Sequence, residues 1–142
     1  MKSIKFIPLI LIILLVGCQE NRVNRLLPGS WKLESHKWVN ELGFMQECGG
    51  TGKLEIGNCK KGDCSFSFEL NSDCSATTYT WNETGTYQVI EKGQDFLFMR
   101  PNPTSSLDTV QYQVFIVTST DLKVGIRDAV NNESHEFLFS RN

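Results

Sequence analysis

The sequence predicts one all-β domain of about nine short strands, a barrel or a sandwich. Two observations favour it. From Ser30 onward, short runs rich in Val, Ile, Thr, Tyr, Phe and Trp recur roughly every ten residues, separated by Gly, Asn, Asp and Pro. Within several runs, apolar and polar residues alternate, as in a sheet with one buried face and one wet face. We find no convincing helical periodicity in this region.

The first segment, residues 1–17, is predicted to be a lipoprotein signal peptide. Lys2 and Lys5 form a short basic start, and residues 6–16 are uncharged and largely apolar. That run is shorter than the ~20 residues a spanning helix needs. It ends in Leu15-Val16-Gly17-Cys18, which resembles a bacterial lipobox. The resemblance implies cleavage before Cys18 and a lipid on its sulfur; the alternative is an uncleaved anchor with an incidental cysteine.

Lipidation would hold the mature chain on a membrane, because each buried methylene contributes about 0.8 kcal/mol. Residues 18–28 are then a lipidated tether. Residue 19 is Gln. In enteric lipoproteins, Asp at this position retains the protein in the inner membrane. We therefore expect a location in the outer membrane of the cell envelope, with the domain facing either the periplasm or the cell exterior. Loss of residues 1–17 removes two of 14 basic residues and none of 16 acidic ones, giving 12 − 16 = −4. A mildly acidic chain without a basic patch argues against nucleic acid as a partner.

The four remaining cysteines, Cys48, Cys59, Cys64 and Cys74, predict two disulfides in an exported domain. A hairpin folded between Cys59 and Cys64 places these two opposite each other and leaves Cys48 one residue out of register with Cys74. This favours the nested pairs 59–64 and 48–74, with the other two pairings left open. A four-cysteine metal site is disfavoured, because the two C-x-x-C knuckles of structural zinc sites are missing.

The expected strands follow in chain order. They are Trp31–Val39, Lys53–Gly57, Ser65–Leu70, Ala76–Trp81, Thr86–Glu91, a run that starts at Asp95, Thr109–Val117, Leu122–Ile126 and Glu136–Phe139. The segment from Asn82 to Gly85 is expected to be a turn, and residues 101–106 a loop, because Gly, Asn, Pro and Ser favour them.

Alternation along these strands assigns an aromatic inward face. The rings that could line a pocket there are Phe66, Phe68, Tyr79, Trp81, Tyr87, Phe96, Phe98, Tyr112 and Phe137. An interior this aromatic either fills a small barrel or lines an apolar pocket. A void of about 300 Å³ or more, open at one end, would favour a pocket. The two histidines, His36 and His135, are far apart in the chain and are expected at the surface or rim.

Gly29-Ser30-Trp31, a Gly-x-Trp motif at the start of the first strand, is similar to that of lipocalin-like domains, in particular the small lipocalin-like lipoproteins of Bacteroidetes. Gly85-Thr86-Tyr87 and the closing strand from His135 to Arg141 also resemble that family. The resemblance covers most of residues 27–142. It implies that residues 29–142 form a small antiparallel up-and-down β-barrel of about eight or nine strands. It also implies that Gly29, Trp31 and Arg141 close the base of that barrel. Arg141 would cover Trp31 in a cation–π contact.

We find no Gly-x-Ser-x-Gly, Gly-rich phosphate loop or His-Glu-x-x-His, so no enzymatic activity, cofactor or metal is expected. Two functions stay open. The barrel binds a small apolar or amphipathic ligand, or a barrel with a filled core acts through its surface on a protein partner in the envelope, as an interaction or inhibitor module. Asp108-Thr109-Val110 resembles the short O-glycosylation motif of Bacteroidetes, which makes Thr109 a candidate modification site.

Overall fold

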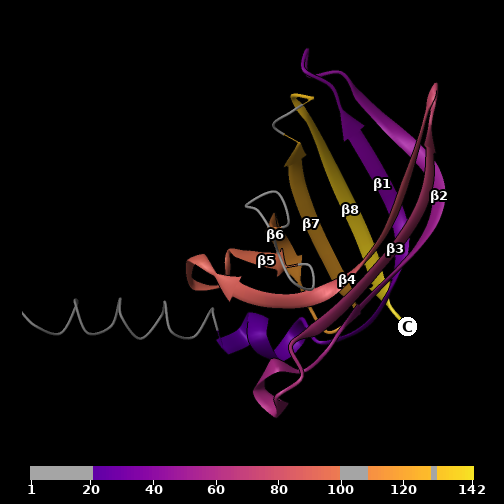
Figure 1. The fold of residues 1–142 in the computed structure, drawn as a ribbon. Coiled ribbons are helices and arrows are strands. Elements are labelled where there is room, and N and C mark those ends of the chain that lie inside the picture. Colours follow the sequence, from indigo (N-terminus) through magenta and orange to yellow (C-terminus); the bar gives the residue numbers. More distant parts are fainter. Residues whose placement is uncertain (1–20, 100–108, 129–130) are drawn as a thin grey trace, which may run out of the picture.

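The fold is a closed barrel of eight antiparallel strands, one fewer than the nine runs expected from the sequence. The computed structural model describes residues 21–99, 109–128 and 131–142. The strands are β1 (Gly29–Val39), β2 (Met45–Ile56), β3 (Ser65–Cys74), β4 (Thr77–Ile90), β5 (Asp95–Met99), β6 (Thr109–Val117), β7 (Asp121–Asp128) and β8 (Glu133–Arg141), with 3-10 turns η1 (Cys59–Lys61) and η2 (Glu91–Gly93). Each strand pairs with the next and β8 pairs with β1, which closes the barrel in up-and-down order (Figure 1).

The expected turn at Asn82 to Gly85 is wrong. These residues lie inside β4, and they pair without interruption with β3 from Phe66↔Gly85 to Glu69↔Asn82. Polar composition suggested a turn, but alternation continues across the segment, because positions 79, 81, 83, 85 and 87 of β4 are all less exposed than their neighbours. Two expected strands are therefore one long strand, and the count is eight.

The C-terminal part of the expected tether, residues 21–27, belongs to the folded domain. Residues 21–26 form a short helix, and Val23 and Leu27 are 3% and 0% exposed. This helix lies under one end of the barrel, which we call the base; the opposite end, where the β1–β2 hairpin turns, is the mouth (Figure 1). Among residues 21–99, 109–128 and 131–142, no helix is long and apolar enough to cross a membrane. The signal peptide, Cys18 and the loop expected at residues 101–106 lie outside the described residues.

A β-bulge in β1 changes which side chains face inward. The ladder between β1 and β8 shifts between Leu33 and Ser35. Trp31 and Leu33 are buried before the shift and His36 is buried after it, so the inward positions change from odd to even numbers. Because an extra residue in one strand reverses the alternation downstream, His36 and Trp38 face into the mouth half of the barrel.

The base half of the barrel is filled by side chains. Its largest fully buried residues are Leu27, Trp31, Leu54, Phe68, Leu122, Phe137 and Phe139. The rings of Phe68, Phe137 and Phe139 pack with centroids 5.6 to 6.2 Å apart. An eight-stranded barrel is just wide enough for its own side chains. In this half the large rings from β3 and β8 fill the interior that a ligand would otherwise occupy.

Candidate functional site

The base is closed by Arg141, which lies beside the first residues of β1. Trp31 and Arg141 are directly paired between β1 and β8, and the Arg141 guanidinium carbon lies 4.1 Å from the centre of the Trp31 ring. The same guanidinium donates hydrogen bonds to the carbonyls of Pro28 (2.9 Å), Leu26 (2.6 Å) and Ser119 (2.7 Å). The cation–π contact expected from the family resemblance is therefore present.

Gly29 is needed at this base. Its φ is +141°, a conformation that other residues rarely adopt, and a Cβ placed on it would collide with the Arg141 guanidinium. The three residues expected at the base, Gly29, Trp31 and Arg141, thus form one contact set. Trp31 Nε1 also donates to the carbonyl of Leu27 (2.9 Å), which fixes the helix beneath the barrel.

Two disulfides join the cysteines in the nested pairs. We call Cys48–Cys74 the barrel disulfide and Cys59–Cys64 the turn disulfide. The ladder of β2 and β3 runs from Ile56↔Phe66 to Gly49↔Asp73, so the next position places Cys48 directly opposite Cys74. The offset of one residue expected from the turn is therefore wrong, because η1 occupies the turn. The barrel disulfide lies inside the mouth half, with Cys74 only 3% exposed.

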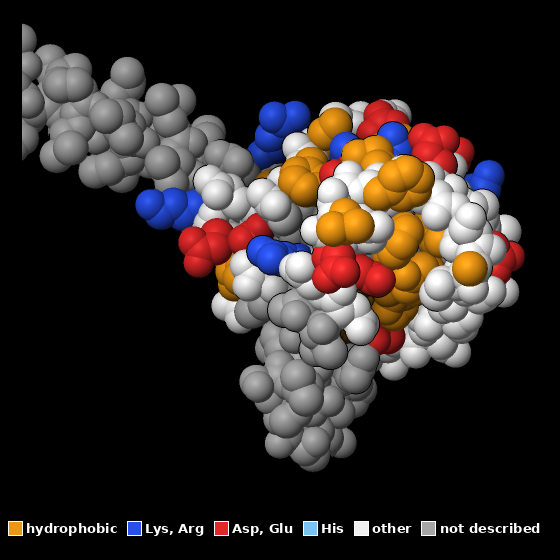
Figure 2. Space-filling view, turned by 90° about the horizontal axis from the view of Figure 1, so that it is seen from above, with side chains coloured by type: hydrophobic (Ala, Val, Ile, Leu, Met, Phe, Trp, Pro, Cys, Tyr) orange, Lys and Arg blue, Asp and Glu red, His pale blue; other side chains and the backbone are white. Residues whose placement is uncertain are grey.

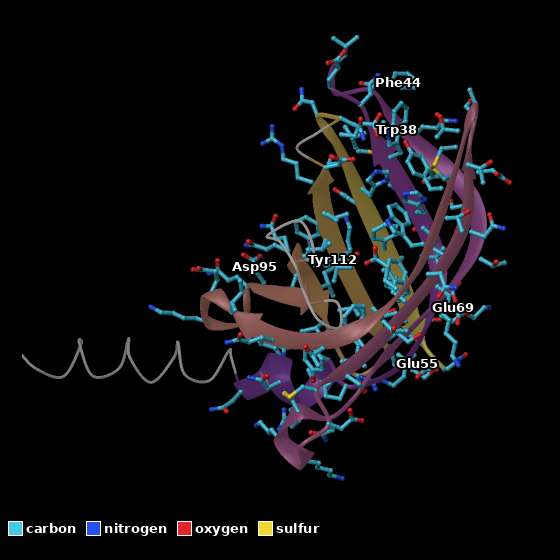
Figure 3. All side chains as sticks on the ribbon, in the orientation of Figure 1. Trp38, Phe44, Glu55, Glu69, Asp95 and Tyr112 are labelled. Carbon is cyan, nitrogen blue, oxygen red and sulfur yellow. A yellow bond between two sulfur atoms is a disulfide. The ribbon has the colours of Figure 1, made fainter. Side chains whose placement is uncertain are left out.

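Most of the predicted lining rings belong to the packed core. Phe66, Phe68, Tyr87, Tyr112 and Phe137 are all at most 3% exposed and belong to one apolar cluster. For these five the expectation of a pocket lining is wrong, because rings from facing strands meet across a narrow barrel. Tyr112 lies deep within the barrel (Figure 3).

Of the predicted lining rings whose side chains the structure describes, Tyr79 and Trp81 stand at the mouth. Tyr79 and Trp81, from β4, are half-buried. Phe96 and Phe98 lie on β5, but their side chains are outside the described part, as is the Thr109 side chain.

The mouth half contains a hydrogen-bonded pair of buried histidines. His36 and His135 are 1% and 3% exposed, so their expected place at the surface or rim is wrong. His36 Nε2 lies 2.9 Å from His135 Nδ1, and His36 Nδ1 lies 2.8 Å from Ser72 Oγ. Alternation along β1 does not predict that His36 faces inward, because the bulge shifts the inward positions. Alternation along β8 does predict it for His135, which lies two residues from the buried Phe137.

The hydrogen bonds determine which nitrogen of each histidine donates and which accepts. Ser72 Oγ donates to the carbonyl of Gly49 (3.2 Å) and so accepts from His36 Nδ1. His36 Nε2 then carries no proton and accepts from His135 Nδ1–H. His135 Nε2 is therefore left as an acceptor, and it makes no hydrogen bond to any residue that the structure describes. The pair presents one unused lone pair inside the barrel.

Gly50 allows Ser72 to sit at the end of this chain. A Cβ at position 50 would lie 2.6 Å from the Ser72 Cα, closer than real side chains approach. The serine can pack against β2 only because this residue has no side chain. The relay of Gly49, Ser72, His36 and His135 therefore joins β2, β3, β1 and β8.

Burial keeps both histidines neutral. Burial, with a smaller effect of His135, lowers the pKa of His36 to about 4. Burial also lowers the pKa of His135, while Glu133 and Asp128 oppose that shift. Neutral imidazoles are what the directed hydrogen bonds require. Nearby, burial and the Glu133 carboxylate raise the pKa of Tyr79 to about 12, and the Tyr79 hydroxyl donates to Glu133 (3.1 Å).

Aromatic rings surround the unused histidine nitrogen. The Tyr79 and Trp81 rings stand edge-on to the His135 ring, with centroids 4.8 and 5.2 Å away. Trp38 is paired directly with His135 across β1 and β8, near the mouth (Figure 3). Trp38 Nε1 is buried and has no hydrogen-bond partner in the described part of the chain. We call Trp38, Tyr79, Trp81 and His135 the mouth site.

The β1–β2 hairpin carries an exposed apolar tip beside the mouth site. Leu42, Phe44 and Met45 are 86%, 64% and 54% exposed, and Phe44 lies near Trp38 (Figure 3). The view from above shows hydrophobic side chains gathered on this face, with acidic side chains around them (Figure 2). We call Leu42, Phe44 and Met45 the hairpin tip.

Comparison with known proteins finds a structural neighbour but no family. No family model and no curated protein matches the chain. A solved structure described as a de novo designed fluorescence-activating β-barrel is similar with a TM-score of 0.49 and 13% identity, over 84% of this chain and 97% of that one. The barrel fold is established by the strand pairing of this chain.

Proposed function

We propose that this protein is a lipid-anchored, lipocalin-like barrel of the bacterial envelope that binds a small amphipathic molecule at the mouth site. The ligand has an apolar, planar body and offers both a hydrogen-bond acceptor and a donor. Its acceptor meets Trp38 Nε1, and its donor meets His135 Nε2. The aromatic rings of Tyr79 and Trp81 pack against its body.

One observation carries this proposal: two unused polar atoms of opposite kind sit on directly paired residues inside the mouth. Trp38 Nε1 is a donor without a partner, and His135 Nε2 is an acceptor without one, among the residues described. A buried polar atom left without a hydrogen bond costs about 1–3 kcal/mol. A ligand acceptor at Trp38 Nε1 would recover this free energy on binding.

The binding test uses 1-anilinonaphthalene-8-sulfonate, whose amine donates, whose sulfonate accepts and whose rings are apolar. We expect saturable fluorescence enhancement from one site on the folded full chain. Trp38→Phe combined with His135→Phe keeps rings at both positions and removes both polar atoms, so it should weaken binding at least about tenfold. Leu42→Ser with Phe44→Ser is the matched control in the hairpin tip and should leave the affinity unchanged. Equal binding by wild type and the mouth variant would contradict the proposal.

The anchoring half of the proposal rests on the lipobox-like Leu15-Val16-Gly17-Cys18. Mass spectrometry of the mature chain should show Cys18 as the first residue with a mass increase from acyl chains. Cys18→Ser should abolish that modification and release the chain from the membrane fraction. A membrane-bound Cys18→Ser chain that keeps residues 1–17 would instead support an uncleaved anchor.

A second candidate function is favoured by the hairpin tip. Three large apolar side chains, exposed together, are typical of a surface that contacts another protein. In this alternative the barrel is an envelope interaction module and the mouth site is structural. The two candidates separate in the dye experiment, because binding at the hairpin tip would be lost in the Leu42→Ser, Phe44→Ser chain and retained in the mouth variant.

A further inference from the structure

His36 and the barrel disulfide lie in one row across three neighbouring strands. His36 of β1 is paired with Cys48 of β2, and Cys48 is bonded to Cys74 of β3, with 4.4 Å between their Cα atoms. All three side chains face the interior of the mouth half. The Cys74 sulfur lies 3.9 Å from His36 Nδ1, and the three potential ligand atoms lie within 4.8 Å of one another.

We propose that reduction of the barrel disulfide creates a zinc-class metal site made by Cys48, Cys74 and His36. Thiolate and imidazole are the donors that Zn²⁺ favours. In a tetrahedral site their atoms stand about 3.5–3.8 Å apart, as follows from Zn–S and Zn–N bonds near 2.3 and 2.0 Å. The sulfur and nitrogen that already lie 3.9 Å apart need only a small adjustment.

The disulfide closes this site in the oxidised chain. The thiolate is the metal ligand, and in the disulfide each sulfur is bonded to the other. A dithiol opens the site by exchange: it gives two electrons and two protons to the Cys48–Cys74 bond and becomes a disulfide itself. When a divalent metal then binds, the two thiol protons leave to solvent and the sulfurs bind as thiolates.

The groups that would support the metal ligand are already in place. A metal-ligating histidine usually donates its other N–H to a neighbour. His36 Nε2 lies 2.9 Å from His135 Nδ1, the geometry of such a hydrogen bond. Metal on His36 Nδ1 moves the imidazole proton to Nε2, which then donates to His135 Nδ1. Three protein ligands leave a fourth position open, as in catalytic rather than structural zinc sites.

Metal binding would also reverse the hydrogen-bonding character of the mouth. In the oxidised chain, His135 donates from Nδ1 and its Nε2 is an acceptor. Once His36 donates to His135 Nδ1, the neutral His135 ring carries its proton on Nε2, which becomes a donor. A reduced, metal-loaded chain therefore presents a different partner to molecules at the mouth than the oxidised chain does.

The test uses the full chain with Cys59→Ser and Cys64→Ser, which removes the turn disulfide as a source of other thiols. The chain is reduced with dithiothreitol, freed of it under nitrogen, and titrated with Co²⁺ as a spectroscopic probe and with Zn²⁺ in competition. We expect one Co²⁺ per chain, with thiolate-to-cobalt charge-transfer absorption and the intense bands of tetrahedral cobalt. The oxidised chain should show neither.

Two variants assign the ligands. His135→Phe keeps the three ligands and should weaken the metal affinity about 10–100-fold. His36→Phe removes a ligand and should weaken it further, with a change in the cobalt bands. Cobalt bands of equal strength in the oxidised chain, unchanged affinity in His36→Phe, or loss of β-sheet circular dichroism on reduction would each overturn the proposal.

Discussion

Acid should destabilise this protein through its buried histidine pair. In the folded chain, burial lowers the pKa of His36 to about 4, against an ordinary value of 6.5. The unfolded chain therefore binds a proton on His36 at a pH where the folded chain does not. Stability rises with pH wherever the unfolded state binds more protons. The free energy of unfolding should consequently fall as the pH drops from 6.5 towards 4.

The size of this loss follows from the gap between the two pKa values. A gap of about 2.5 pH units corresponds to about 3 kcal/mol, since each unit contributes 1.36 kcal/mol. The pKa of His135 is also lowered by burial and acts in the same direction, while Glu133 and Asp128 reduce its share. A loss of about 3 kcal/mol is a large part of the 5–15 kcal/mol typical of a domain.

The assay is urea unfolding of the full chain, followed by tryptophan fluorescence, at several pH values between 4 and 7.5. His36→Phe removes the titrating group and keeps a ring stacked on Phe137, whose centroid lies 4.8 Å from that of His36. We expect this variant to lose most of the pH dependence, even if it is less stable throughout because His135 and Ser72 lose their partner. Parallel curves for wild type and His36→Phe would show that His36 is not the source of the pH dependence.

Three further predictions concern stability. Trp31→Ala should cost about 3–5 kcal/mol, as expected of a fully buried ring under Arg141, whereas half-buried Trp38→Ala should cost about 1–2 kcal/mol; equal midpoints in urea would count against the base contact. Gly29→Ala should be destabilised by thermal melting more than a Gly62→Ala control, because both glycines have positive φ but only position 29 meets the guanidinium. Removal of the barrel disulfide, which spans 26 residues, should cost about 3.5 kcal/mol and removal of the turn disulfide, which spans 5, about 2 kcal/mol in the loop-entropy model; a larger loss from the turn disulfide would contradict this order.

Alternation predicted the all-β class, the lipocalin resemblance predicted the barrel, and cysteine spacing favoured the nested disulfides that the structure contains. The period of two in strands such as Ser65–Cys74 and Glu133–Arg141 reports directly on which side faces the core. It failed where a local irregularity intervened. The bulge between Leu33 and Ser35 reverses the inward positions and so hides His36, because no composition signal marks an extra residue in a strand.

The mouth site was predicted only in part, for a different reason. Tyr79 and Trp81 follow from parity, but the histidine pair joins residues 99 positions apart in the chain. Such a contact depends on the pairing of β1 with β8 and on the tilt of the strands. The spacing of residues along one strand predicts neither of these. Likewise, composition alone does not decide whether inward rings fill a barrel or line a pocket.

Native mass spectrometry shows directly whether the mouth site holds a small molecule. The full chain would be purified in mild detergent and compared with the Trp38→Phe, His135→Phe chain and with the Leu42→Ser, Phe44→Ser control. We predict a bound small-molecule mass on wild type and on the control that is missing from the mouth variant. Wild-type protein that carries no such mass, or a mass retained by the mouth variant, would contradict the claim.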